Sequence, residues 1–550
     1  MPNINALHAP FVFDDDTSIV QNDALRPPVS PARLWALQPA RFVGNLTFAL
    51  NRAAGGLRVE GYHAVNIAVH ALASLAVFWL LLLIYRTPAF DDGTTSQRRI
   101  WLAGFGALAF ATHPLQTAAV TYVVQRFASL AALFYILAVA AYLEARLATG
   151  PRRWAWLAAC AISCALALGT KQNAFSLPLM LGMTELSFCD GGDRGWRRPA
   201  AALAALVVLA AALALLDLLP RETLAVSRPQ YLFTQCRVLL TYLRLVVAPV
   251  GQRVDYDIPV YRSLLAPPVL AGCLALALLV TVALASYRRQ RLLWFGIVWF
   301  LIALSIESSL IPISDMAFEH RLYLPLAGFA MALAWLAGRC LARVRARLVI
   351  VVAAALLACY GASTWARNEI WRSRLRIVND TIVKAPRKAR PLDYRGTLFE
   401  GLGWYYQAYG DYSGAAAVDS TYWKAYYHRG SLLARTGRYR DALPDLDRAI
   451  ALAPDFAPAY INKGNAMLAL GQADSAIFCY NEALSLDIDD GNAYGNRGLA
   501  LFSKGEARQA LADYGRALAL DSTLHHVRLD RGLALNAMGR YDEALADLDA

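Results

Sequence analysis

Long apolar segments separated by short polar turns fill the chain from residue 62 to residue 365. Because apolar runs of this length fit the hydrocarbon thickness of a bilayer, we predict ten membrane-spanning helices. The predicted spans cover residues 62–85, 100–114, 118–147, 154–170, 172–189, 199–219, 266–286, 291–311, 321–341 and 347–365. Residues 231–250 are also apolar, but Arg237 and Arg244 share roughly one helical face, so we expect an amphipathic or re-entrant helix on the outer side.

Every second loop between the predicted spans carries three or four arginines. The positive-inside rule places such loops in the cytoplasm and the alternate loops on the other side. The alternate loops begin with HPLQT, TKQNA, LPRETLAVS and IPISDMAFEH and are poorer in basic residues. Residues 1–61 and all residues after 366 are then extracytoplasmic. The formal net charge of +12 is therefore a sign of membrane topology and not of nucleic-acid binding.

A period of 34 residues marks the C-terminal part of the chain. The recurring residues are Gly430, Gly464, Gly498 and Gly532, with parallel series at Gly437, Gly471, Gly505 and Gly539 and at Ala442, Ala476, Ala510 and Ala544. This is the period of tetratricopeptide repeats (TPRs), in which small residues let paired helices pack closely. The sequence stops inside the last repeat without a capping helix, so we expect a truncated C-terminus.

The predicted fold class is therefore all-α. Residues 1–61 form a first extracytoplasmic loop, residues 62–366 a polytopic helical membrane domain, residues 367–396 a linker and residues 397–550 an α-solenoid of TPRs. A hydrophobic content of 57% and a charged content of 17% agree with a membrane protein. The excess of arginine over lysine and the many alanines are typical of GC-rich bacterial genomes, so we expect a bacterial inner membrane.

Known soluble-enzyme motifs are missing from the sequence. It holds no P-loop, no H-E-x-x-H and no G-x-S-x-G, which excludes a soluble nucleotide-dependent enzyme. The eight cysteines follow no disulfide or metal-binding pattern, and we interpret them as packing residues.

Three consecutive acids, Asp14, Asp15 and Asp16, stand in the stretch FVFDDDTSIVQN before the first predicted span. One interpretation is a solvated acidic turn, or an N-cap for a helix at TSIVQN. The alternative, which we favour, is a carboxylate held at the membrane surface as a general base for a hydroxyl acceptor. Repulsion between neighbouring carboxylates would raise one pKa toward the range suited to proton transfer.

Basic residues at the outer ends of the predicted spans are candidates for binding a lipid-linked phosphate. Arg126 and Arg321 carry guanidinium groups that can bind phosphate bidentately, and Lys171 emerges as a lone cation from an apolar segment. Snorkelling at the membrane interface is the alternative for the arginines. Glu319 and His320 precede Arg321 directly, whereas His113 is expected to be a structural helix end before Pro114.

The order of several motifs resembles one known family. FVFDDDTSIVQN, GYHAVNIAVHALA, HPLQTAAVTYVVQR, TKQNAFSLP and EHRLYLPLAGF, followed by TPRs, resemble the transmembrane and TPR-containing O-mannosyltransferases, which have the GT-C glycosyltransferase fold. The resemblance implies an enzyme that takes a sugar from a polyprenyl-phosphate donor on the outer face. It implies protein hydroxyls as acceptors and implies that Asp14 and Asp15 are the catalytic acids, with Asp16 as an extra.

Three departures from the family pattern qualify this expectation. Family members begin with a span before the acidic loop, and we expect that this span is missing here. Ala118 and Gln172 stand where the family often has glutamate.

Two alternative functions remain open from the sequence. One is a lipid-linked oligosaccharide ligase or polymerase, for which residues 220–265 with Arg221, Arg228, Arg237 and Arg253 would supply the outer loop. The other is a non-catalytic scaffold that binds proteins through its solenoid. We commit to no metal site, although a divalent ion is conceivable near clustered carboxylates.

Overall fold

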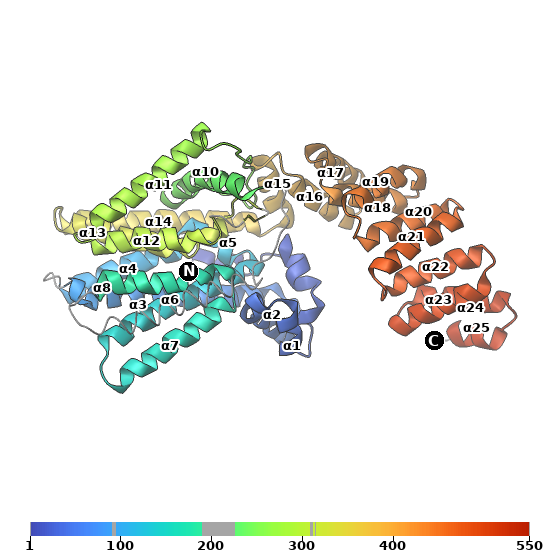
Figure 1. Ribbon diagram of the computed structural model, residues 1–550, viewed down its shortest axis with the longest axis horizontal. Coiled ribbons are helices and arrows are strands. Elements are labelled where there is room, and N and C mark those ends of the chain that lie inside the picture. The colour runs from blue at the N-terminus through green and yellow to red at the C-terminus, as the bar shows by residue number, and fades with distance from the viewer. Residues whose placement is uncertain (1, 91–94, 190–225, 309–311, 314, 549–550) are drawn as a thin grey trace. The chain divides into compact units, whose positions relative to one another are not determined.

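The computed structural model describes residues 2–90, 95–189, 226–308, 312–313 and 315–548, which contain helices and no strand (Figure 1). The predicted all-α fold is confirmed. The described chain divides into two compact units, Met1–Lys384 and Ala385–Ala550. The predicted span at 199–219 lies outside the described residues.

The first unit is a bundle of long helices that run alongside one another (Figure 1). They are α3 (Val59–Arg86), α4 (Ser96–Thr112), α6 (Arg126–Leu147), α7 (Pro151–Leu168), α8 (Leu177–Phe188), α10 (Arg228–Val247), α11 (Pro267–Ser286), α12 (Arg291–Ser305), α13 (Pro325–Leu341) and α14 (Ala346–Trp371). Helix α6 packs against α3 and α7, and α13 packs against α12 and α4. The expected amphipathic segment at 231–250 forms α10, which packs against α11.

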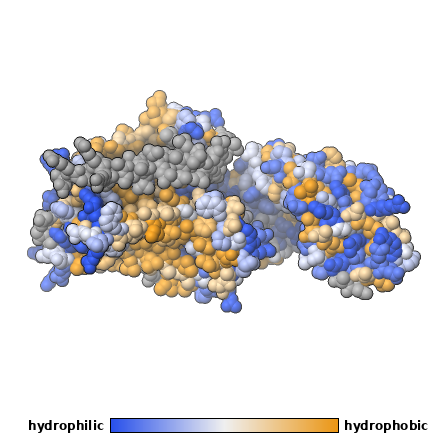
Figure 2. Space-filling view, turned by 60° about the horizontal axis from the view of Figure 1, so that its bottom comes forward, coloured by the Kyte–Doolittle hydropathy of each residue, from blue (hydrophilic) through white to orange (hydrophobic). Residues whose placement is uncertain are grey.

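Four segments of this bundle are long and apolar enough to cross a membrane: Val59–Arg86, Val123–Leu147, Pro267–Ser286 and Ala346–Trp371. Shorter apolar helices are Arg291–Ser305 and Pro325–Leu341. Figure 2 shows a broad hydrophobic surface on the bundle. These features identify a membrane protein, as expected.

The predicted span at 118–147 is not one continuous helix. Helix α5 (Thr117–Val120) and the short helix η7 (Val123–Gln125) come first, and Tyr122 between them has an extended backbone. The break lets the chain turn at the end of the bundle before α6 begins at Arg126. The apolar composition of the segment gave no sign of this turn.

Residues 1–61, expected to be a loop, consist mainly of short helices packed on the end of the bundle. They are η1 (Pro2–Ala6), η2 (Asp16–Val20), η3 (Asp23–Leu25), α1 (Pro31–Leu37), η4 (Pro39–Arg41) and α2 (Phe42–Gly55). Val12, Ile19 and Leu25 are buried, and η1 contacts α14. This packing gives the acidic stretch a fixed position.

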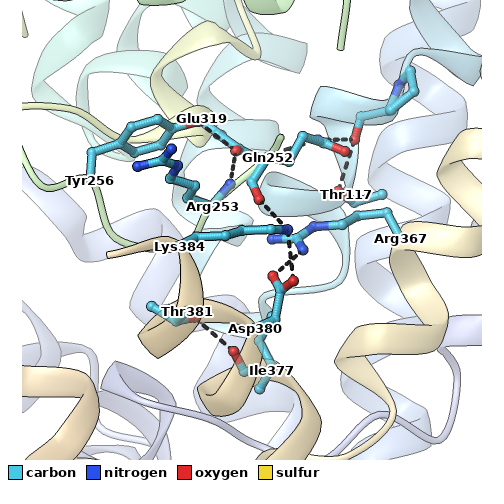
Figure 3. A network of polar contacts seen from close by, with 11 residues as sticks. Thr117, Gln252, Arg253, Tyr256, Glu319, Arg367, Ile377, Asp380, Thr381 and Lys384 are labelled. Atoms are coloured by element: carbon cyan, nitrogen blue, oxygen red, sulfur yellow. Dashed lines mark hydrogen bonds and ion pairs between the residues drawn. The ribbon is translucent and has the colours of Figure 1, made fainter. Parts of the chain in front are cut away.

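Residues 367–396, expected to be a linker, are largely helical. Helix α14 continues to Trp371, α15 spans Arg374–Lys384, and α16 (Ala389–Gly401) opens the second unit. In Figure 3 the Arg367 guanidinium and the Lys384 ammonium both bind the carboxylate of Asp380, each at 2.7 Å. Ile377 and Val378 bury one face of α15. The polar composition of residues 367–396 suggested a linker, but α15 is an amphipathic helix.

The second unit is an α-solenoid of helix pairs, as predicted from the 34-residue period. Its helices after α16 are α17 (Tyr405–Val418), α18 (Trp423–Arg435), α19 (Tyr439–Leu452), α20 (Ala457–Ala469), α21 (Ala473–Leu486), α22 (Gly491–Ser503), α23 (Ala507–Leu520), α24 (His525–Ala537) and α25 (Tyr541–Leu548). Gly437, Gly471, Gly505 and Gly539 follow the first helix of four pairs with positive φ, a conformation that favours glycine.

An arginine on the first helix of most pairs binds an aspartate sixteen residues later on the second helix. The pairs are Arg395–Asp411, Arg429–Asp445, Arg497–Asp513 and Arg531–Asp547. The middle pair of helices, α20 and α21, departs from this pattern because Cys479 stands at the aspartate position. There Lys463 binds Asp447 of the preceding helix at 2.7 Å instead.

Two glycines on neighbouring helices test the packing of the solenoid. A β-carbon at Gly498 would lie 2.8 Å from the Tyr514 ring, whereas one at Gly515 on α23 would meet no atom within 4 Å. We expect Gly498→Ala to lower the free energy of unfolding by about 1–3 kcal/mol through overpacking. Gly515→Ala should raise it by about 0.5–1 kcal/mol. Denaturant unfolding of residues 385–550 measures both, and equal effects would contradict the described packing.

Candidate active site

A cavity of about 390 Å³ lies in the first unit, at the end of the bundle where the N-terminal segments pack. Its walls come from the acidic stretch, the start of α6 and the polar segments around residues 171 and 320. The polar lining residues are Asp14, Thr17, Ser18, Arg41, Gln125, Lys171, Gln172, Glu307, Asp315, His320 and Arg321. Four predicted site residues therefore meet here: Asp14, Lys171, His320 and Arg321.

The three consecutive acids have three different environments. Asp14 is exposed and lines the cavity, and its backbone N–H donates a hydrogen bond to the Tyr122 hydroxyl at 2.9 Å. Asp15 is fully buried beneath it. Asp16 lies 3.6 Å from the Arg374 guanidinium, outside the cavity lining. Of the two acids expected to act together, the structure places only Asp14 where a substrate can reach it.

The Asp15 carboxyl group connects two parts of the chain. It accepts hydrogen bonds from the backbone N–H of Val12 at 3.0 Å and of Val124 at 2.7 Å. Burial raises the pKa of Asp15 to about 8, and the charges of Asp14 and Asp16 add to this effect, while the two N–H donors oppose it. Phe13, which stands between Val12 and Asp14, has a φ of 50°, an uncommon conformation for residues other than glycine. The result is a tight turn that presents Asp14 to the cavity.

The opposite charge in the cavity comes from Arg41, Lys171 and Arg321. The Lys171 ammonium lies 2.6 Å from the Glu307 carboxylate, and burial lowers the pKa of Lys171 while Glu307 opposes this. The Arg321 guanidinium donates to the backbone carbonyl of Asp315 at 2.8 Å and to that of Glu307 at 3.3 Å. These contacts hold Lys171 and Arg321 in place within the cavity wall.

His320 stands among these cations as a neutral side chain. Burial, with the positive charges of Lys171, Arg321 and Arg41, holds its pKa well below the ordinary value. Its ring stacks on Phe318 with centroids 4.9 Å apart. A neutral imidazole can both donate and accept a hydrogen bond, so His320 can pair with either kind of polar group in the cavity.

Arg126, expected to bind phosphate, does not line the cavity. Its buried guanidinium donates to Asn66 Oδ1 at 2.6 Å, to Asn51 Oδ1 at 2.7 Å and to the Tyr62 carbonyl at 3.0 Å, and it lies over the Phe48 ring. Protein groups thus bind all three nitrogens of Arg126 at the start of α6.

His113 and Glu319 also lie away from the cavity lining. His113 ends α4, and its ring accepts from the Leu115 N–H and contacts the Val246 carbonyl, which agrees with the expected helix end. Glu319 is buried and binds the side chains of Gln252 and Tyr256 (Figure 3). Burial raises the pKa of Glu319. Glu319 therefore anchors the segment that carries His320.

Sequence reasoning missed Arg41, Glu307 and Asp315. Glu307 interrupts the apolar segment predicted at 291–311, and this polar break was a usable signal. Of the two departures from the family pattern, Gln172 lines the cavity, whereas Ala118 is buried in α5 outside it. Among the described residues, no group of three or more His, Cys, Asp or Glu side chains is arranged to hold a metal ion.

The pKa of Asp15 leads to a prediction about stability. Between about pH 4 and pH 8 the folded chain keeps a proton on Asp15 that the unfolded chain releases, since the ordinary pKa is 3.8. Stability should therefore fall as pH rises through this window, by up to about 1.4 kcal/mol per pH unit. Asp15→Asn should flatten this dependence, whereas exposed Asp14→Asn should not. Thermal unfolding of detergent-solubilised protein from pH 5 to pH 9 measures it, and parallel curves would contradict the assignment.

Comparison with known proteins gives a repeat family and a group of similar transferases. A family of tetratricopeptide repeats matches residues 433–495. The chain is 31% identical over 215 residues to protein O-mannosyl-transferase Tmtc1 of Drosophila melanogaster, covering 35% of this chain and 23% of that protein. It is 33% identical over 153 residues to protein O-mannosyl-transferase TMTC1 of Homo sapiens, covering 25% of this chain and 16% of that protein.

The chain thus spans less than a quarter of the length of these relatives. Among solved structures, the TPR protein YrrB is 20% identical, covering 31% of this chain and 89% of that chain with a TM-score of 0.28. The resemblance predicted from the order of the motifs is confirmed: the chain is a relative of the transmembrane and TPR-containing protein O-mannosyl-transferases and carries TPRs itself.

Proposed function

We propose that the chain is a GT-C-type membrane glycosyltransferase that moves a hexose from a polyprenyl-phosphate donor to protein hydroxyls. The names of its relatives support the reaction class. The observation that carries the proposal is the cavity in which an exposed carboxylate, Asp14, shares one space with Arg41, Lys171 and Arg321. An acid and a cluster of cations are the two parts that sugar transfer from a phosphate requires.

Each group has a role in this scheme. The Asp14 carboxylate takes the proton of the acceptor hydroxyl as the hydroxyl oxygen attacks the anomeric carbon. The bond from that carbon to the phosphate oxygen breaks, and polyprenyl phosphate leaves with the electron pair. The three cations stabilise the negative charge that grows on the leaving phosphate. Attack from the face opposite the phosphate inverts the anomeric configuration.

The solenoid fits a protein acceptor or partner. Stacked helix pairs form an extended surface that suits a protein chain. The motif order and the arginine pattern favour an extracytoplasmic reaction, in a bacterial inner membrane, with the solenoid on the same face. The alternative enzyme is a lipid-linked oligosaccharide ligase, which would use a diphosphate-linked glycan as its donor. The donor that the chain accepts therefore distinguishes the two enzymes.

Asp14→Asn tests the proposed base. The variant keeps the shape of the side chain but cannot take a proton, so transfer should fall about 10²- to 10⁴-fold. The assay follows label from radiolabelled polyprenyl-phosphate mannose, or its glucose counterpart, into protein in membranes. Asp16→Asn is the matched control because Asp16 stands two residues from Asp14 and lies outside the cavity lining. Full transfer by Asp14→Asn would rule out Asp14 as the base.

Lys171 tests the donor site. Lys171→Met alone would leave Glu307 buried without its partner, so Lys171→Met/Glu307→Gln is the cleaner variant. Loss of one charge-assisted contact to phosphate should raise the KM for the donor about 10- to 100-fold and leave the KM for the acceptor unchanged.

The matched control is Arg146→Gln/Glu185→Gln, which removes an ion pair of 2.8 Å elsewhere in the bundle. An equal rise in donor KM for both double variants would show a general loss of structure and would reject Lys171 as a phosphate contact.

A further inference from the structure

A second cavity, of about 440 Å³, lies at the other end of α12 and α13. The first cavity is bordered by residues after α12 and before α13, such as Glu307 and Arg321. The second is bordered by the turn before α12 and by the end of α13, together with the end of α3 and the start of α4. The two cavities therefore lie at opposite ends of the same two helices.

Five arginines from three separate parts of the bundle, the start of α4, the turn into α12 and the end of α13, line this second cavity: Arg98, Arg288, Arg289, Arg291 and Arg339. The described lining includes no aspartate or glutamate. Arg98 and Arg291 donate to the backbone carbonyls of Gly338 and Ser187 at 2.8 and 3.0 Å. Like charges that converge repel one another, and the described lining offers them no acidic side chain, so a bound anion would stabilise this end of the bundle.

Topology alone does not account for this arrangement. The positive-inside rule requires arginines in these loops but does not require them to surround one cavity. The loop that holds Arg152 and Arg153 provides the comparison: both are exposed and neither lines the cavity. The planar guanidinium fork matches phosphate oxygens bidentately, which makes phosphate the anion that fits best.

The surroundings favour a lipid as the source of that phosphate. Tyr85, Phe90 and Trp335 line the cavity together with the arginines, and aromatic rings of this kind are typical of the membrane interface. The end of α13 also borders an apolar groove of about 250 Å³ formed with α14. Leu336, Leu348 and Val352 are exposed in that groove, as expected for a surface in contact with acyl chains.

We propose that this cavity binds the phosphate headgroup of an anionic glycerophospholipid, separate from any donor substrate. The headgroup would join the ends of α4, α12 and α13 through the arginines, while the acyl chains lie along the apolar groove. Anionic lipids are enriched in the cytoplasmic leaflet, the side to which the arginine-rich loops are assigned by their charge.

Binding to purified full-length protein tests this proposal. Delipidated protein in neutral detergent is titrated with phosphatidylglycerol and, separately, with phosphatidylcholine. Arg289→Gln/Arg339→Gln removes two exposed cavity charges and should weaken phosphatidylglycerol binding about 30-fold, as two charges at roughly 1 kcal/mol each imply. The matched control, Arg152→Gln/Arg153→Gln, makes the same charge change outside the cavity and should bind like the unaltered chain.

Competition on the unaltered chain separates lipid from soluble anion and needs no variant. Inorganic phosphate at millimolar concentration should not displace phosphatidylglycerol, and phosphatidylcholine should bind far more weakly. Displacement by phosphate would show a site for a soluble anion and overturn the proposal. Equal binding of the two lipids, or an equal loss of affinity in both double variants, would overturn it as well.

Discussion

The hydrogen bonds of the buried Asp15 carboxyl group hold the candidate active site together. Through the N–H groups of Val12 and Val124, this one side chain joins the N-terminal stretch to the turn that precedes α6. The cavity needs that connection, because Asp14 comes from the first segment and Gln125 from the second. A neighbouring acid thus acts as the support for the exposed one, and the burial of Asp15 is what leaves Asp14 accessible.

The sequence predicts the fold well where a period or a long apolar run controls it. The 34-residue spacing of glycines predicts the solenoid, and the apolar segments fall on helices throughout the described bundle. It fails where packing overrides composition, as in α15, where Asp380 binds Arg367 of α14 and Lys384 donates to the Gln252 carbonyl (Figure 3).

Part of the candidate site could be predicted because polar residues inside apolar segments stand out in the sequence. Lys171, His320 and Arg321 stand at polar interruptions of apolar segments, and such residues are costly unless they have a use. Arg126 has the same signal, yet its donors are satisfied by Asn51 and Asn66. A sequence shows that a buried guanidinium needs partners but does not show whether protein or ligand provides them.

The hairpin of α20 and α21 lacks the arginine–aspartate pair of the other hairpins, and this affects how the solenoid responds to a pulling force. Bidentate arginine–aspartate pairs clamp the two helices of the other four hairpins, so each of these hairpins resists being pulled open as a unit. In the middle hairpin Lys463 reaches back to Asp447, and Cys479 offers no counter-charge. Under tension the hairpin of α20 and α21 should therefore open before the other four, because no arginine–aspartate pair links its two helices.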